Sequence, residues 1–154
     1  MRSRTLALGV LGLLMASCSQ LAPNTTPIFL AKLSGENVVP KITSEAWGYA
    51  NGTLSGNDLT LNGKFFRLSG KVTGVKLMQG KVGQNSAMLA VCTFDPAKEI
   101  QNDASKVGNG TFGKTCTFKD HKINEDVVKT GGYYLVVTTE AHPDGELRGQ
   151  LGYE

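Results

Sequence analysis

The segment GGYYLVVTTEAHPDGELRGQLGYE, residues 131–154, has the clearest structural pattern in the sequence. Its part Tyr133–Thr139 is rich in aromatic and β-branched residues, and it predicts a β-strand. The tripeptide at residues 143–145, Pro-Asp-Gly, predicts a turn, and Glu146–Tyr153 predicts the returning strand. Alternation along this strand places its apolar residues on one face and Arg148 on the other. A closing hairpin of this kind needs a further sheet, which the preceding residues must supply.

Several short segments upstream also have the composition of β-strands. They are Ile28–Leu33, Ala46–Leu54, Leu59–Leu68, Lys71–Met78 and Ala87–Phe94. Turn residues separate them, and none has a convincing helical period. This pattern predicts an all-β fold, an antiparallel Greek-key β-sandwich of seven or eight strands.

Finer details can be predicted for four parts of the chain. The nearly continuous apolar run Ala87–Phe94 predicts a central strand. A change of apolar phase near Gly63-Lys64 predicts a bulge or bend. The polar stretch Asp95–Thr115 predicts a long loop. The stretch Ile123–Val128 is compatible with either one helical turn or a short strand.

The N-terminus has the pattern of an export signal. Arg2 and Arg4 precede the apolar run Leu6–Ala16, which is too short to span a bilayer as a helix. The run leads into Leu-Met-Ala-Ser-Cys, which resembles a bacterial lipobox with Cys18 as the lipidated residue. Cleavage by ordinary signal peptidase after Ser17 and retention of the segment are the alternatives.

This pattern divides the chain into three parts. We expect a lipoprotein signal peptide at residues 1–17, a lipidated tether at 18–27 and a β-sandwich domain at 28–154. Acyl chains on Cys18 would anchor the protein to a membrane. Removing Arg2 and Arg4 leaves 14 of the 16 basic residues against 13 acidic ones, a net charge of about +1. So small a charge argues against nucleic-acid binding.

The two remaining cysteines predict a disulfide. Cys92 and Cys116 form an even pair, which is the usual arrangement in exported proteins. The bond would close a loop of about 25 residues and stabilise the fold by roughly 3–4 kcal/mol. Two free buried thiols are the alternative. A metal site is a weaker one, because the spacing matches no CxxC pattern.

Three stretches together resemble the CHRD (chordin-type) domain. They are Phe29–Pro40, Gly70–Ser86 and Tyr133–Leu151, and the last is similar to the family's closing motif Pro-x-Gly-Glu-Ile-Arg-Gly-Gln. The resemblance implies an immunoglobulin-like or superoxide-dismutase-like β-sandwich with an extracellular binding or structural role. The family usually carries a His-x-His pair in the central stretch and a histidine in the closing strand. Lys76, Met78 and Val137 stand at those positions, which argues against an inherited metal site.

The candidate metal ligands are few. His121 and His142 are the only histidines, and a copper site of the superoxide dismutase kind uses more imidazoles than two. They form a weak copper site only if the fold brings them together, with Met78 as a further soft ligand. The simpler interpretation is that both histidines lie in exposed loops and that Met78 lies in the core.

Arg148 has two possible roles. Superoxide dismutases use an arginine near the C-terminal strand to guide the anion to copper, and Arg148 has a similar position. The simpler prediction is a pair with Glu146, two residues away on the same strand face. The tyrosines at 133 and 134 could join Trp47 and Tyr49 in an exposed binding patch, although core positions are commoner for such residues.

Three hypotheses for the function follow. The first is a lipid-anchored binding or structural accessory module of the cell envelope, with an envelope protein, a surface-layer or outer-membrane complex, or a wall polymer as partner. The second is an extracytoplasmic copper-only superoxide dismutase-like enzyme. The third is a structural spacer without a ligand. The sequence contains no Gly-x-Ser-x-Gly and no His-Glu-x-x-His.

Overall fold

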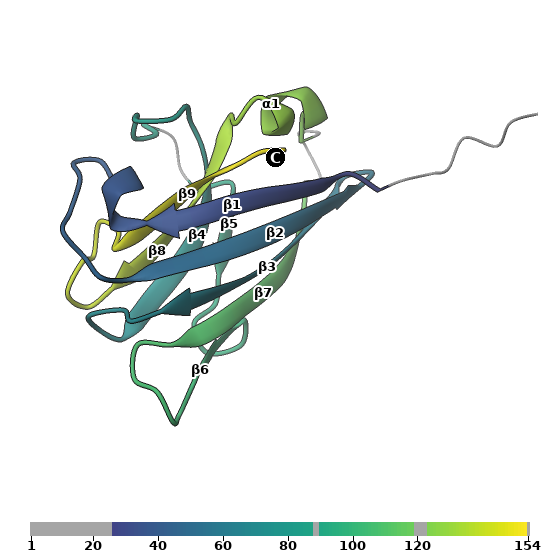
Figure 1. The fold of residues 1–154 in the computed structure, drawn as a ribbon. Coiled ribbons are helices and arrows are strands. Elements are labelled where there is room, and N and C mark those ends of the chain that lie inside the picture. Colours follow the sequence, from purple (N-terminus) through teal and green to yellow (C-terminus); the bar gives the residue numbers. More distant parts are fainter. Residues whose placement is uncertain (1–25, 88–89, 119–122, 154) are drawn as a thin grey trace, which may run out of the picture.

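A computed structural model describes residues 26–87, 90–118 and 123–153, which form two packed layers of antiparallel strands (Figure 1). The expected signal peptide, Cys18 and His121 lie outside these residues. The described elements are β1 (Ile28–Ser34), η1 (Gly35–Asn37), β2 (Trp47–Ser55), β3 (Asp58–Phe66), β4 (Val72–Gln79), β5 (Cys92–Phe94), β6 (Ile100–Asn102), β7 (Gly110–Thr117), α1 (Glu125–Lys129), β8 (Tyr133–Thr139) and β9 (Leu147–Leu151).

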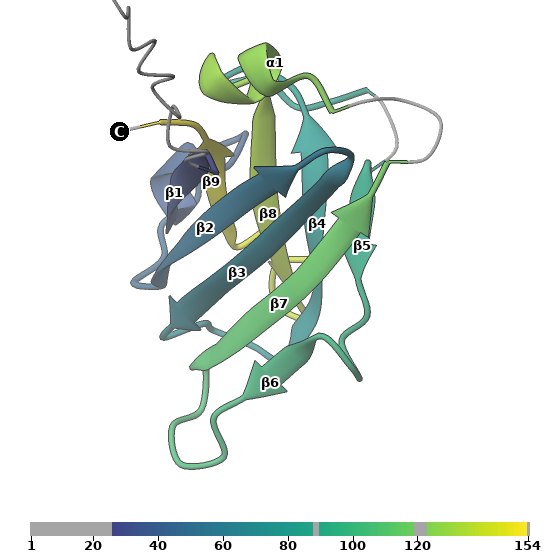
Figure 2. The same ribbon diagram turned by 90° about the vertical axis from the view of Figure 1, so that its right-hand side faces the viewer.

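The strands follow the order β5-β4-β8-β9-β1-β2-β3-β7-β6. Figure 2 shows β2, β3, β7 and β6 in one layer, with β9, β8, β4 and β5 behind them. The layers are continuous where β1 meets β9, through the pairs Ser34–Arg148 and Leu30–Gly152. Strand β3 pairs with β7 rather than with its successor β4, as in a Greek key. The all-β prediction is confirmed, with nine strands in the described residues rather than seven or eight.

The core lies between the two layers and follows from the period-2 pattern of the strands. In β1, Phe29, Ala31 and Leu33 point inward and the residues between them point outward. The expected closing hairpin is confirmed, since β8 and β9 pair from Tyr133–Leu151 to Val137–Leu147. All seven residues of β8 are buried. Strand β8 is therefore covered on both faces, by the core on one side and by loops on the other.

The predictions for residues 87–115 were partly wrong. Among the described residues of the expected central strand Ala87–Phe94, only the edge strand β5, three residues long, is present. The expected loop contains β6 and most of β7, which pairs with β3 over eight residues from Asp58–Thr117 to Phe65–Gly110. Strand β7 has few apolar residues, and only Phe112 and Cys116 of its eight residues are buried. Phe112 packs edge-on against Phe94 at 5.5 Å between ring centroids.

The predicted bulge at Gly63-Lys64 was also wrong. Strand β3 pairs in register with both neighbours through this point. Gly63 continues the inward face of the strand, and a Cβ there would lie only 2.6 Å from Cε1 of Phe112. Phe66 points outward instead, stacked on Trp47. The register shift in the sheet lies at Val72–Gly74 of β4.

The ambiguous stretch after β7 is helical at its C-terminal end. The side chain of Asn124 accepts hydrogen bonds from the backbone N–H groups of Asp126 and Val127, so it caps α1. Lys129 Nζ forms an ion pair with Glu125 Oε1, one helical turn earlier, at 2.7 Å. No helix within the described residues is both long and apolar enough to cross a bilayer.

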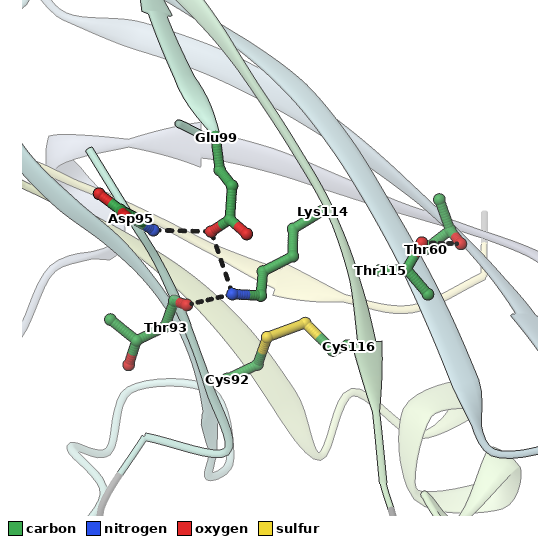
Figure 3. Close-up of a disulfide and its surroundings, with 8 residues drawn as sticks. All are labelled: Thr60, Cys92, Thr93, Asp95, Glu99, Lys114, Thr115 and Cys116. Carbon is green, nitrogen blue, oxygen red and sulfur yellow. Dashed lines mark hydrogen bonds and ion pairs between the residues drawn. A yellow bond between two sulfur atoms is a disulfide. The ribbon is translucent and has the colours of Figure 1, made fainter. Parts of the chain in front are cut away.

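The edge between β5 and β7 is held together by covalent and ionic contacts. The predicted disulfide is confirmed: Cys92 and Cys116 are bonded, with their Cα atoms 6.0 Å apart (Figure 3). Beside it, Lys114 Nζ donates to Thr93 O at 2.9 Å and to Glu99 Oε2 at 3.0 Å. The same carboxylate oxygen accepts from the backbone N–H of Asp95 at 2.7 Å. These contacts join the layers where no strand ladder does.

Removal of the disulfide should lower the free energy of unfolding. In the double variant Cys92→Ser, Cys116→Ser the unfolded chain regains the freedom of a loop of about 25 residues, so we expect a loss of about 3 kcal/mol. Urea unfolding of the oxidised wild type and the double variant measures it. Dithiothreitol should weaken the wild type to the same extent and leave the variant unchanged. Equal stability of all samples would contradict this role.

The carboxylate of Glu99 should give the protein an acid-sensitive component of stability. Burial would raise the pKa of Glu99, but the hydrogen bonds from Asp95 N–H and Lys114 hold it below its usual value of 4.5. A lowered pKa in the folded state stabilises the fold above the unfolded pKa, and this contribution disappears as the pH falls through the folded value. Urea unfolding between pH 7 and pH 3 should show a shallower acid loss for Glu99→Gln than for wild type.

The exposed carboxylate of Glu140 provides the control for this measurement. The variant Glu140→Gln should retain the full acid dependence of the wild type. Identical pH profiles for Glu99→Gln and wild type would contradict the assignment.

Candidate functional site

Arg148 is buried between β9 and the segment that follows β4. Only 2% of its surface is exposed. Its Nη2 donates to the backbone oxygens of Lys81 at 3.0 Å and Gln84 at 2.8 Å, and its Nη1 donates to Asn85 Oδ1 at 3.3 Å. The guanidinium carbon lies 3.7 Å from the ring centroid of Tyr134. Burial lowers the pKa of Arg148, and the neighbouring Tyr134 opposes that shift.

The segment 80–86, which we call the clamped loop, is attached to the sheet by more than Arg148. The hydroxyl of Tyr134 accepts from Ser86 N–H at 3.0 Å. The side-chain amide of Gln150 donates to Gly80 O at 2.6 Å and also to Gly131 O. Three side chains of β8 and β9 therefore hold the clamped loop over the outer face of their own sheet.

Glu146 is buried completely and does not pair with Arg148, so the predicted pair was wrong. Its Oε1 accepts from Ser44 Oγ at 3.0 Å and from Ser69 N–H at 2.8 Å, and its Oε2 accepts from Thr139 Oγ1 at 2.8 Å. The turn explains the difference, because Gly145 adopts a φ of 136° and Glu146 precedes the first residue of β9. Glu146 therefore links β8 to the loops before β2 and before β4.

The predicted metal ligands are not brought together in the described part of the chain. Met78 and Arg148 line one depression, with Lys76 beside them, but His142 is not among the residues that line it. His142 belongs to the β8–β9 turn, where its backbone N–H donates to Thr139 Oγ1. Val137, which stands at the position of the family's closing-strand histidine, is fully buried in the core. Within residues 26–87, 90–118 and 123–153, no three His, Cys, Asp or Glu side chains cluster as metal ligands would.

A second concave surface lies on the outer face of the opposite layer. Two adjoining depressions share Lys64, Gln101 and Thr111, and each has a volume of about 380 Å³. We call this surface the outer groove. It is defined by Tyr49, Asn51, Asn62, Lys64, Phe66, Gln101 and Thr111.

Two exposed aromatic residues lie at this groove, as one of the sequence-based alternatives expected: Tyr49 lines it, and Trp47 stacks on Phe66, which also lines it. Trp47 and Tyr49 are 48% and 44% exposed, whereas the tyrosines at 133 and 134 are buried. Trp47 stacks on Phe66 with 4.3 Å between ring centroids and 22° between ring planes. The alternation of β2 indicated the shared face of Trp47 and Tyr49. The partners from β3, β6 and β7 were missed because their positions depend on strand register.

Comparison with protein families identifies the chain. The model of the CHRD domain matches residues 29–151, which cover most of the sequence. The chain belongs to the CHRD domain family. No curated protein matched it, and no solved structure did. The expected likeness to immunoglobulin or superoxide dismutase sandwiches therefore stays a prediction.

The closing motif of this CHRD domain has a structural role in the described residues. Glu146 binds two loops, Arg148 and Gln150 bind the clamped loop, and Gly149 gives room for β1, since a Cβ there would lie 2.7 Å from Leu33 Cδ2. The motif that carries the resemblance thus supports the fold. The anion-guiding role of Arg148 stays untested, and its guanidinium is already bonded to the clamped loop.

Replacement of Arg148 should release the clamped loop of the CHRD domain. In Arg148→Lys a single ammonium replaces a planar fork that makes three hydrogen bonds and stacks on Tyr134, so we expect a loss of about 2–3 kcal/mol in unfolding free energy. Hydrogen exchange of residues 80–86 should quicken more than that of the β2–β3 hairpin. The exposed Arg67, with Arg67→Lys, is the matched control. Unchanged exchange at 80–86 would contradict the assignment.

Proposed function

We propose that this CHRD protein is a lipid-anchored binding module of the cell envelope, an accessory part of an envelope or surface-layer complex. The observation that carries the proposal is the outer groove with its exposed aromatic side chains. Exposed aromatic patches on small domains typically mark interaction surfaces, since burying them in water-excluded contacts is favourable. The lipobox-like sequence at Cys18 supports attachment to a membrane.

The distribution of polar groups supports binding rather than catalysis. Glu146 and Arg148, the most deeply buried charges among the described residues, are each bonded to loops of the protein itself. Groups so engaged are poorly placed to contact a substrate or to guide an anion. The described residues offer no observation in favour of the copper-dependent alternative, whose other ligand, His121, lies outside them.

Lipidation predicts the location of the protein in fractionated cells. We expect the wild type in the membrane fraction, released only by detergent. The variant Cys18→Ser has no acylated residue, so it should stay in its precursor form or be released as a soluble protein. The neighbouring substitution Ser19→Ala is the control and should leave membrane attachment unchanged. A wild type found in the soluble fraction would contradict the anchor.

A second measurement tests binding in the same membranes. Chemical crosslinking of intact cells should join the wild type to another envelope component, and the variant Cys18→Ser should give fewer such products because it is no longer held at the membrane. Recovery of the wild type only as a free monomer would contradict the role as an accessory module.

A further inference from the structure

The outer groove is built from four neighbouring strands in register. Tyr49 on β2 lies opposite Lys64 on β3, Lys64 lies opposite Thr111 on β7, and Thr111 lies opposite Gln101 on β6. All four side chains belong to the outward face, since buried core residues alternate with them on each strand. The groove thus has a row of side chains running across the strands on a hydrogen-bonded sheet. Such a surface is largely pre-organised before a ligand arrives.

The aromatic side chains at one end of the groove are held in fixed orientations. Trp47 and Phe66 stack on each other, and the ring centroid of Tyr49 lies 6.3 Å from that of Phe66. Nearly half of the Trp47 and Tyr49 surfaces is nonetheless exposed. A ring that is ordered before binding loses little conformational entropy when a ligand covers its face. These rings offer flat apolar faces, which fit the C–H faces of sugar rings.

The polar side chains next to the rings carry both donors and acceptors. Asn51 lies opposite Asn62 across β2 and β3, and Gln101 and Thr111 continue the polar surface toward β6. Each amide provides two N–H donors and a carbonyl acceptor, and the hydroxyl provides one donor and two acceptor sites. Sugar hydroxyls and N-acetyl groups also donate and accept together. Amides beside aromatic rings therefore match a sugar polymer better than an apolar peptide.

The charge of the groove favours a ligand that carries carboxylates. Lys64 is exposed at the centre of the row, and Lys98 lines the same depression. The carboxylate of Glu99, which also lines it, is already bonded to Lys114. Lys98 Nζ lies 3.5 Å from Asp95 Oδ2. The second depression is also lined by Lys106 and Asp103, which carry opposite charges. Lys64 is the cation that both depressions share, and it is placed to meet an acidic group of a bound polymer.

We propose that the outer groove binds the glycan strand of peptidoglycan, a polymer of N-acetylated sugars with carboxylate-bearing substituents. Its sugar rings lie on Tyr49 and Trp47, its N-acetyl and hydroxyl groups bind Asn51 and Asn62, and its carboxylates face Lys64. This inference deepens the proposed envelope-binding function and rests on it. The tether at residues 18–27 extends by at most about 35 Å, which keeps the groove near the membrane and its adjacent polymer.

Sedimentation with insoluble polymers tests the proposal directly. The full-length protein, purified in detergent, is mixed with purified peptidoglycan, with chitin, which has N-acetyl groups but no carboxylates, or with cellulose, which has neither. We expect the tightest binding to peptidoglycan, weaker binding to chitin and none to cellulose. Tyr49→Ala and Asn62→Ala should each weaken binding to peptidoglycan about tenfold. Lys64→Gln should weaken binding to peptidoglycan and leave binding to chitin unchanged.

The matched control is a tyrosine of similar exposure outside the groove. Tyr153 is 47% exposed, and Tyr153→Ala should bind all three polymers as the wild type does. Circular dichroism confirms that each variant is folded. Binding to cellulose as tight as to peptidoglycan, or unchanged binding by both Tyr49→Ala and Asn62→Ala, would overturn the proposal. So would loss of crosslinked protein partners in these variants with peptidoglycan binding intact, since the groove would then be a protein interface.

The two proposals fail in different ways. Membrane fractionation and crosslinking in cells decide whether the protein is an anchored envelope module. Sedimentation decides which ligand its groove takes. A protein that stays in the membrane fraction but does not sediment with peptidoglycan overturns the glycan assignment alone. A protein that sediments but is found unanchored overturns the anchor alone.

Discussion

Two buried charges, one just before the last strand and one within it, hold several loops of this domain in place. Glu146 and Arg148 are 0% and 2% exposed, and a charge this deep is costly unless it is hydrogen-bonded. Their partners come from residues distant in sequence, namely Ser44, Ser69 and the clamped loop. The hydrogen bonds that satisfy Glu146 and Arg148 therefore also fix the loops that supply their partners. Loss of either side chain would leave backbone groups without the partner that fixes them.

Features that depend on a local sequence pattern could be predicted from the sequence. The hairpin of β8 and β9 was predicted from strand alternation and turn residues, and the disulfide from a cysteine pair in a chain that looked exported. The family was predicted from three stretches of sequence, of which the closing motif is the most specific. The β-strand at Gly110–Thr117 was missed because its stability comes from pairing with β3, about 50 residues earlier. Gly63 leaves the space that the ring of Phe112 occupies. This contact between two strands distant in sequence cannot be read from the pattern of either strand alone.

The same reasoning explains the outcome for the candidate sites. Arg148 was singled out by analogy, but its partners lie 63 to 67 residues away, so spacing predicted a pairing with Glu146 instead. The shared face of Trp47 and Tyr49 followed from alternation within one strand. The other residues of the outer groove could not be predicted, because only the register of β3, β7 and β6 brings them next to Tyr49. The domain thus uses its buried charges, Glu146 and Arg148, to hold its own loops, and its outer groove presents amides, aromatic rings and Lys64.

The two strands at the ends of the strand order, β5 and β6, bear on whether copies of this domain associate through the edges of their sheets. Each is only three residues long, so each of these two terminal strands presents few unpaired backbone groups. Long exposed edges recruit strands from other molecules, and short ones do not provide enough hydrogen bonds for this. The disulfide further fastens β5 to β7, which prevents the edge from peeling open. Copies of this domain packed densely on one surface should therefore remain separate molecules and not polymerise through their sheets.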